Sequence, residues 1–223
     1  MLKKLLWISV IACCLVWSPS RVTALSSAGN QHVGRDAASS YNRQGLAAYR
    51  KQKFEKAIEY FSSALLYKAD FAEAYNNRGN AYYHLKDYSN ARRDYDQAIE
   101  IRANFAEAYN NRGNLHYADN QLEAALEDYA RAIAHRPHYS NSYYNRGNVF
   151  YEQRQYFQAI EDYSQALLLE PDFASALLNR GLAHHQLGLV HQARIDIKQA
   201  LQLAKKQKDK PLVQLAQDAL LSF

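Results

Sequence analysis

The sequence predicts an all-helical solenoid of five helix pairs, closed at its C-terminal end by a capping helix. Five glycines recur with a constant spacing of 34 residues, at Gly45, Gly79, Gly113, Gly147 and Gly181. A unit of this length holds two short helices, and neither can bury its apolar face until the next unit stacks on it. The period therefore indicates a surface built by repetition.

Residues 1–24 form a predicted secretory signal peptide. Two lysines precede an apolar run that ends at Trp17, and a small-residue cleavage site follows at Ala24. The run is shorter than the roughly 20 apolar residues that a bilayer span requires. We expect cleavage after Ala24 and export to the periplasm, the thylakoid lumen or the extracellular space. Two alternatives stay open: an uncleaved leader that anchors the chain, and a lipoprotein modified at Cys13, which follows a lipobox-like segment.

Net charge and cysteine content exclude some classes of function. The formal net charge is +5, and loss of Lys3, Lys4 and Arg21 with the leader lowers it to +2. A near-neutral chain lacks the basic bias of a nucleic-acid binder. Both cysteines, Cys13 and Cys14, belong to the leader, so the mature chain has no disulfide framework and no thiol chemistry.

The remaining chain divides by pattern. Residues 25–36 show no apolar periodicity, which predicts a flexible linker. Residues 37–207 hold the five repeats, at about 38–71, 72–105, 106–139, 140–173 and 174–207. Residues 208–223 contain Asp209 and Pro211, which can start a helix, followed by apolar residues on one helical face. We expect this last helix to cap the exposed edge of the stack.

Small and bulky residues recur at fixed positions within each repeat when Ala38 is counted as position one. Tyrosine occupies position four in four repeats, glycine position eight in all five, and alanine positions 20 and 27. Position 24 is bulky: Phe61, Tyr95, Tyr129, Tyr163 and Ile197. This pattern resembles the tetratricopeptide repeat family over residues 38–207. The resemblance implies a right-handed superhelix. One departure from the family pattern is that arginine replaces the leucine before the glycine in four repeats.

These arginines have candidate partners inside the chain. Position 23 is aspartate in the four repeats that carry arginine at position seven, and it is Tyr60 in the first repeat, which carries Gln44 instead. We therefore hypothesise that each arginine reaches the aspartate of its own repeat, as Arg112 would reach Asp128. The alternative is that both groups are solvated at the surface.

The resemblance places ligand binding on the concave surface, which the first helix of each repeat forms. Asparagines recur there at positions six and nine: Asn77, Asn111, Asn145 and Asn179, with Asn80, Asn114 and Asn148. Asparagine is a mediocre helix former, so helix stability does not explain these rows. They either hold the backbone of an extended peptide through their amides or pair with neighbouring repeats. Position twelve adds tyrosines suited to recognition: Tyr49, Tyr83, Tyr117 and Tyr151.

The sequence thus predicts a non-enzymatic scaffold or assembly factor that binds a protein or peptide partner. No arrangement of residues predicts a catalytic, cofactor or metal site: His184 and His185, for example, are adjacent on a helix and point about 100° apart. No nucleic-acid partner is expected, and membrane contact is expected only through the leader or a lipid on Cys13. Two alternatives remain, a glycan or cell-wall binder that uses the groove tyrosines and a lipidated subunit of an envelope complex.

Overall fold

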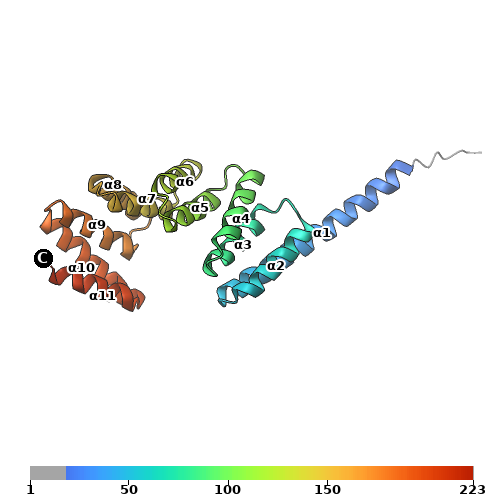
Figure 1. The fold of residues 1–223 in the computed structure, drawn as a ribbon. Helices are drawn as coiled ribbons and strands as arrows, with labels where there is room; N and C mark the ends of the chain where they lie inside the picture. Colours follow the sequence, from blue (N-terminus) through green and yellow to red (C-terminus); the bar gives the residue numbers. More distant parts are fainter. Residues whose placement is uncertain (1–18, 223) are drawn as a thin grey trace, which may run out of the picture.

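The computed structural model describes residues 19–222, with side chains from residue 35 onward. This part of the chain is helical throughout and holds no strand. Its helices follow one another in order along the stack (Figure 1). They are α1 (Pro19–Arg50), α2 (Phe54–Tyr67), α3 (Ala72–His84), α4 (Tyr88–Ile101), α5 (Ala106–Ala118), α6 (Leu122–His135), α7 (Ser140–Glu152), α8 (Tyr156–Leu169), α9 (Ala174–Gln186), α10 (Val190–Gln207) and α11 (Lys210–Leu221).

Each repeat is one hairpin of an odd and an even helix, and the same backbone device turns the chain each time. The residue at position 15 adopts a positive φ in every repeat: Gln52, Lys86, Asn120, Arg154 and Gly188. In this left-handed conformation its N–H closes the end of the odd helix, as Lys86 does by donating to the carbonyl of Tyr83 at 2.9 Å. Two residues later the even helix begins.

At the core of each hairpin, the recurrent glycine of the odd helix lies against the bulky residue at position 24 of the even helix. A Cβ atom on Gly113 would lie 2.7 Å from Cε1 of Tyr129, and the other repeats show equally close approaches. The residues at position 24 are at most 1 % exposed, and so are the alanines at positions 20 and 27. Small and large residues therefore interlock where the two helices meet.

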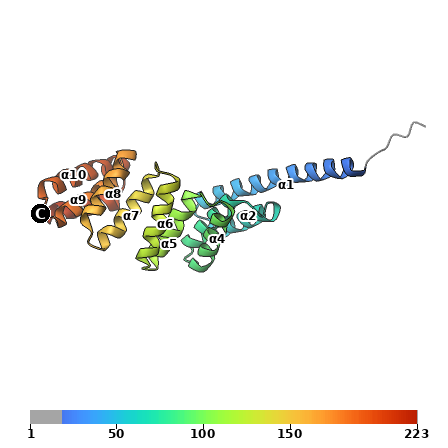
Figure 2. The ribbon, with the colours of Figure 1, turned by 90° about the horizontal axis from the view of Figure 1, so that it is seen from above.

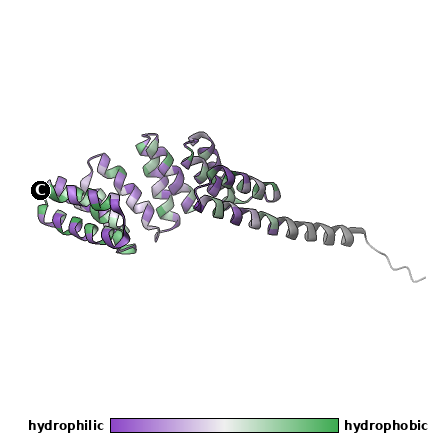
Figure 3. Ribbon diagram, turned by 90° about the horizontal axis from the view of Figure 1, so that it is seen from below, coloured by the Kyte–Doolittle hydropathy of each residue, from purple (hydrophilic) through white to green (hydrophobic). Residues whose placement is uncertain are grey.

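Stacking of the hairpins produces the curvature. Each odd helix from α1 to α7 contacts the next odd helix, whereas the even helices make no comparable contact with one another within residues 19–222. The odd helices therefore lie closer together and form the inner wall. Apolar and polar residues are interspersed along the helices of the stack, since every helix has neighbours on more than one side (Figure 3).

The C-terminal end is closed by α11, which packs on α10 and α9. The side chain of Asp209 caps its first turn by accepting from the N–H of Leu212 at 3.1 Å. Leu212 and Ala216 face inward and are buried. The predicted capping helix is therefore present at this end of the stack.

The N-terminal end differs from the expectation. We predicted a flexible linker over residues 25–36, but these residues belong to α1, whose first part projects beyond α2 (Figure 2). No proline follows Pro19 before residue 50, and proline suits the first turn of a helix, so nothing interrupts the helix of the first repeat. Most of the predicted leader, including Cys13, lies outside the described residues. Among the helices of residues 19–222, none combines the length and the apolarity needed to cross a membrane.

Candidate functional site

The asparagines of the inner wall form a ladder between repeats. Each amide at position six donates to the preceding repeat: Asn77 to Oδ1 of Asn42 at 3.1 Å, and Asn111 to Oδ1 of Asn76 at 2.9 Å. Asn145 donates to Oδ1 of Asn110 and of Asn114, at 3.1 and 3.0 Å. Asn179 likewise reaches the hydroxyl of Tyr144 and Oδ1 of Asn148.

The asparagines at position nine join this ladder to the core. Oδ1 of Asn114 accepts from the buried hydroxyl of Tyr129 at 2.8 Å. Asn80 and Asn148 likewise accept from the hydroxyls of Tyr95 and Tyr163, both at 2.9 Å. Burial raises the pKa of all three tyrosines. The rows therefore set the arrangement of the repeats, which was one of the two interpretations of the sequence.

Part of each amide stays available for a ligand. Within the described residues, Oδ1 at position six and Nδ2 at position nine have no hydrogen-bond partner in the protein. The second, third and fourth repeats thus each keep one acceptor and one donor unpaired, and the fifth keeps the acceptor of Asn179. Pairing between repeats and peptide binding are compatible, because they use different atoms of the same side chains.

The tyrosines at position twelve lie along the same wall, where Tyr49, Tyr83 and Tyr151 are partly buried and Tyr117 is 38 % exposed. Burial raises the pKa of Tyr49, Tyr83 and Tyr151, and burial followed by a hydrogen bond with Glu152 raises the pKa of Tyr117 to about 12. Ring contacts hold three of these rings in place: Tyr49 packs against Phe54, Tyr83 against Tyr88, and Tyr151 against Tyr156, with centroids 5.4–5.5 Å apart. These phenols therefore stay neutral and present flat apolar faces at physiological pH.

Three hollows follow the inner wall, with volumes of about 610, 180 and 490 Å³. The first includes Asn77 in its lining, the second is lined chiefly by Tyr49, Tyr83 and their neighbouring asparagines, and the third includes Tyr117 and Tyr151. Of the eleven residues predicted for the groove, ten line one of these hollows. Asn145 lines none of the three, and its Nδ2 donates to two asparagines of the ladder.

The largest hollow contains charged residues that the sequence analysis missed. Arg102 pairs with Glu73 at 2.7 Å, and its guanidinium carbon lies 3.6 Å from the ring centroid of Phe105. The next repeat places Arg136 against Glu107 and Tyr139 in the same way. A signal was available: cations occupy position 31 and aromatic residues position 34 in each of the first three repeats.

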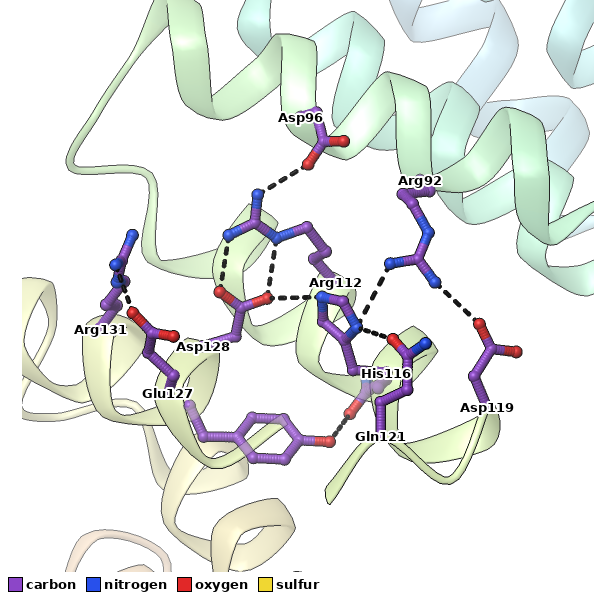
Figure 4. Close-up of polar contacts among 11 residues, drawn as sticks. Arg92, Asp96, Arg112, His116, Asp119, Gln121, Glu127, Asp128 and Arg131 are labelled. Carbon is purple, nitrogen blue, oxygen red and sulfur yellow. Dashed lines mark hydrogen bonds and ion pairs between the residues drawn. The ribbon is translucent and has the colours of Figure 1, made fainter. Parts of the chain in front are cut away.

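The hypothesised arginine–aspartate pairs are confirmed in all four repeats. Arg112 donates from Nε and Nη2 to the two carboxylate oxygens of Asp128, at 2.8 and 2.7 Å (Figure 4). The other three pairs have the same two-bond geometry, with distances of 2.7–2.8 Å. The aspartate side chains are at most 6 % exposed, so these carboxylates depend on their arginines for compensation.

A second set of polar contacts joins the same arginine to the preceding repeat. Nη1 of Arg112 lies 2.7 Å from Oδ1 of Asp96, and Arg92 on the same helix reaches Asp119 at 2.8 Å (Figure 4). His116 lies between these pairs, with Nε2 3.7 Å from Asp128. These groups hold adjacent repeats in register and lie outside the lining of the three hollows.

Comparison with protein families identifies the repeats. A family described as "TPR repeat" matches residues 45–86, 113–154 and 147–188, and families described as "Tetratricopeptide repeat" match residues 72–105 and 174–207. Together these matches cover well over half of the chain. A comparison with curated proteins finds no match.

Solved structures share the fold. A MamA protein is 25% identical, with a TM-score of 0.63, over 78% of this chain and 96% of that chain. PilF of Pseudomonas aeruginosa is 21% identical, with a TM-score of 0.72, over 85% and 91% of the two chains. YrrB, described as a TPR protein with an unusual peptide-binding site, is 18% identical, with a TM-score of 0.61, over 89% and 96%.

Proposed function

This chain belongs to the tetratricopeptide repeat family, and we propose that it is a non-enzymatic scaffold whose inner groove binds an extended segment of a partner protein. The observation that carries the proposal is the coincidence of the three hollows with the asparagine and tyrosine rows. The peptide-binding site named for YrrB indicates that this fold can bind a peptide.

The chemistry of the groove suits an extended backbone. The free Nδ2 and Oδ1 atoms offer a donor and an acceptor in successive repeats, and a peptide backbone carries both kinds of group along its length. Four such contacts, at about 1 kcal/mol net each, would give only millimolar affinity. The tyrosine faces and the Arg102 and Arg136 guanidinium groups must therefore contribute to binding.

We also propose that the chain acts outside the cytoplasm, after cleavage of the leader behind Ala24. Intact-mass measurement of the mature protein tests this step directly. A mass that begins at Leu25 supports it, a diacylglycerol-modified Cys13 would replace it with a lipoprotein, and an unprocessed mass would indicate a retained anchor.

Site-specific crosslinking tests the groove. A photoreactive phenylalanine analogue is placed at Tyr83, Tyr117 or Tyr151 in separate variants of the full chain, expressed in the native host. We expect all three to crosslink to a single partner. Peptide mass mapping should show that the crosslinked residues of the partner follow the order of the three positions along the groove, because an extended segment runs past the repeats in sequence.

The matched control places the same analogue at Phe157, which is 73 % exposed on α8 and lines none of the three hollows. Crosslinks from Phe157 to the same segment, or groove crosslinks without any consistent order, would contradict the proposal. A polysaccharide that quenches tyrosine fluorescence in the absence of any peptide crosslink would favour the glycan-binding alternative instead.

A further inference from the structure

The first repeat leaves uncovered a face that every later repeat buries. Position ten is fully buried in the later repeats, as Ala81, Leu115, Val149 and Ala183. In the first repeat the same position is Ala47, which is exposed. The reason is topological: no even helix of the described chain precedes α1. The capping helix α11 solves this problem at the other end of the stack.

The interior repeats show what normally fills this position. Leu115 of α5 packs against Ala91 and Tyr95 of the preceding even helix, and Val149 packs against Ala125 and Tyr129 in the same way. The residue after the small alanine adds a polar contact, since Arg92 reaches Asp119 at position 14 of the next repeat. A covering helix therefore presents a small residue and an aromatic residue four positions after it. In α4 a charged residue, Arg92, follows the small one, whereas α2, α6 and α8 have Ile58, Leu126 and Ile160 there.

The uncovered face is basic. It holds a hollow of about 220 Å³ lined by Gln44, Ala47, Ala48, Lys51, Lys53, Lys56 and Tyr60. Gln44 and Tyr60 occupy the positions of the arginine–aspartate pair in the later repeats. The three lysines make no ion pair within the described residues, although Lys56 lies 5.7 Å from the ring centroid of Tyr60. Glu55 and Glu59 lie on the same helix but do not line the hollow.

Lysine occupies positions 14, 16 and 19 together only in this repeat. The second repeat has Leu85, Asp87 and Asn90 there, and Asp87 caps its own helix by accepting from the N–H of Asn90. In the third repeat position 14 is Asp119, which pairs with the arginine of the covering helix. Position 14 is uncharged in the other three repeats, so Lys51 has the opposite charge to Asp119, the residue at this position that pairs with its covering helix. A helix that fits the first repeat in the way α4 fits the third therefore needs an acid where α4 has Arg92.

Neither the N-terminal segment of the chain nor the end of α10 supplies such a helix. Residues 1–35 contain four basic residues and no acid, and the end of α10 carries Lys205 and Lys206 followed by Lys208 and Lys210. Both segments would place like charges next to the lysines of the first repeat.

We propose that this end face, defined by the seven residues lining its hollow, binds an acidic amphipathic helix of a partner protein. The helix stacks on the first repeat as an even helix would. Its small residue seats against Ala47, the acid that follows faces Lys51, and the aromatic residue four positions on packs against α1. This site is separate from the inner groove, and it stands or falls independently of the function proposed for that groove.

The probe is a peptide with the sequence of α4, which is 14 residues long, with the substitution Arg92→Glu. Its outward face is stapled, because an isolated helix of this length is marginal in water. The control peptide is the stapled α4 sequence with Arg92 retained. Calorimetric titration into the full chain is expected to give about tenfold tighter binding for the Glu peptide, since the two differ by one reversed charge facing a lysine. Equal affinities would overturn the proposal.

Two protein variants locate the site. Lys51→Glu, Lys53→Glu and Lys56→Glu combined should invert the preference between the two peptides, whereas the matched set Lys205→Glu, Lys206→Glu and Lys208→Glu at the far end should leave it unchanged. Ala47→Trp should abolish binding of both peptides, because it fills the seat on an exposed position that folding does not use. The proposal is wrong if either peptide still binds the Ala47→Trp variant, or if binding is lost in the variant that carries the three substitutions at Lys205, Lys206 and Lys208. Vesicles of phosphatidylcholine with phosphatidylglycerol that bind through the three lysines, while neither peptide binds, would assign the face to a membrane surface instead.

Discussion

Arg112 uses its whole guanidinium group to join two repeats. Two nitrogens bind the carboxylate of Asp128 in its own repeat, and the third binds Asp96 on the preceding even helix. The first contact could be predicted, because arginine and aspartate occur together in four repeats and both are missing from the first. The second could not, because the residue at position 25 changes from repeat to repeat.

Removal of the arginine should leave a buried charge without compensation. We expect Arg112→Ala to destabilise the protein by about 3 kcal/mol, near the lower end for a broken buried pair, since Asp128 is only 5 % exposed but Arg112 keeps some access to water. Asp128→Ala should cost a similar amount, and the double variant little more than either. Urea unfolding of the four proteins measures the coupling, and a value of zero within error would mean that the two groups are independently solvated.

The fourth repeat supplies a control for the third nitrogen. Arg146 pairs with Asp162 but meets Ala130 where Arg112 meets Asp96, so it lacks the bond to the preceding repeat. Arg146→Ala should therefore cost less than Arg112→Ala, by the roughly 0.2–1 kcal/mol of a partly exposed pair. The substitution Ala130→Asp should add a similar amount to the wild-type protein and nothing to the Arg146→Ala variant.

At the level of the helical hairpin, the contact between position eight and position 24 decides whether two helices can approach. We expect Gly113→Ala to destabilise the protein by about 1–3 kcal/mol, because the new Cβ would lie 2.7 Å from the buried ring of Tyr129, which would have to shift within a packed core. Thermal unfolding followed by circular dichroism measures the loss. The change should be accompanied by altered near-ultraviolet signals, since Tyr129 must shift.

Gly188→Ala is the matched control. Gly188 adopts φ +76°, and a Cβ there would meet nothing within 4 Å. Its cost should arise from the backbone alone, about 1 kcal/mol, and should leave the near-ultraviolet spectrum of the tyrosines unchanged. Equal spectra for both alanine variants would contradict the assigned clash.

The helical hairpins could be predicted from the sequence, because the same pattern of small and bulky residues occurs in five repeats and departures in one repeat do not obscure it. The N-terminal extension of α1 was not. Residues 25–36 carry no apolar periodicity and two glycines, a composition typical of a linker. These residues are nevertheless helical, because α1 begins at Pro19 and runs without a break into the first repeat, and no proline after Pro19 interrupts it.

At the scale of the whole molecule, the sequence predicts some of the residues that line the inner wall and misses others. The asparagine and tyrosine rows stand at fixed positions of one helix type, so their common face follows from the period. Arg102 and Arg136 come from the ends of even helices and reach the inner wall only by lying across Phe105 and Tyr139. The spacing of the sequence shows that a cation recurs at position 31, but it does not show that Arg102 and Arg136 lie at the inner wall. The uncovered face of the first repeat likewise emerges only from comparing the exposure of one position in all five repeats.

Three buried tyrosines, one in each of α4, α6 and α8, link the cores of successive repeats to the asparagine ladder. Burial raises the pKa of Tyr95, Tyr129 and Tyr163 above the ordinary value of 10.0. The protonated phenol is therefore favoured in the folded state, and its contribution is fully present below pH 10. Above that pH the unfolded chain loses phenolic protons that the folded chain keeps. Stability should then fall by up to about 1.4 kcal/mol per pH unit for each ring, until the folded phenols also ionise.

Comparison with Tyr129→Phe isolates this effect from other groups that titrate at alkaline pH. At neutral pH the variant should be less stable by about 1 kcal/mol, because the hydrogen bond to Asn114 is lost. As the pH rises above 10, the wild type should lose stability faster than the variant, so that the difference between them shrinks and then reverses. Urea unfolding at half-unit steps from pH 8 to about pH 11.5, with absorbance at 295 nm to count ionised phenols, measures both quantities. A difference that stays constant over this range would mean that Tyr129 exchanges its proton with solvent as freely in the folded solenoid as in the unfolded chain, and the ring would then not be part of a sealed core.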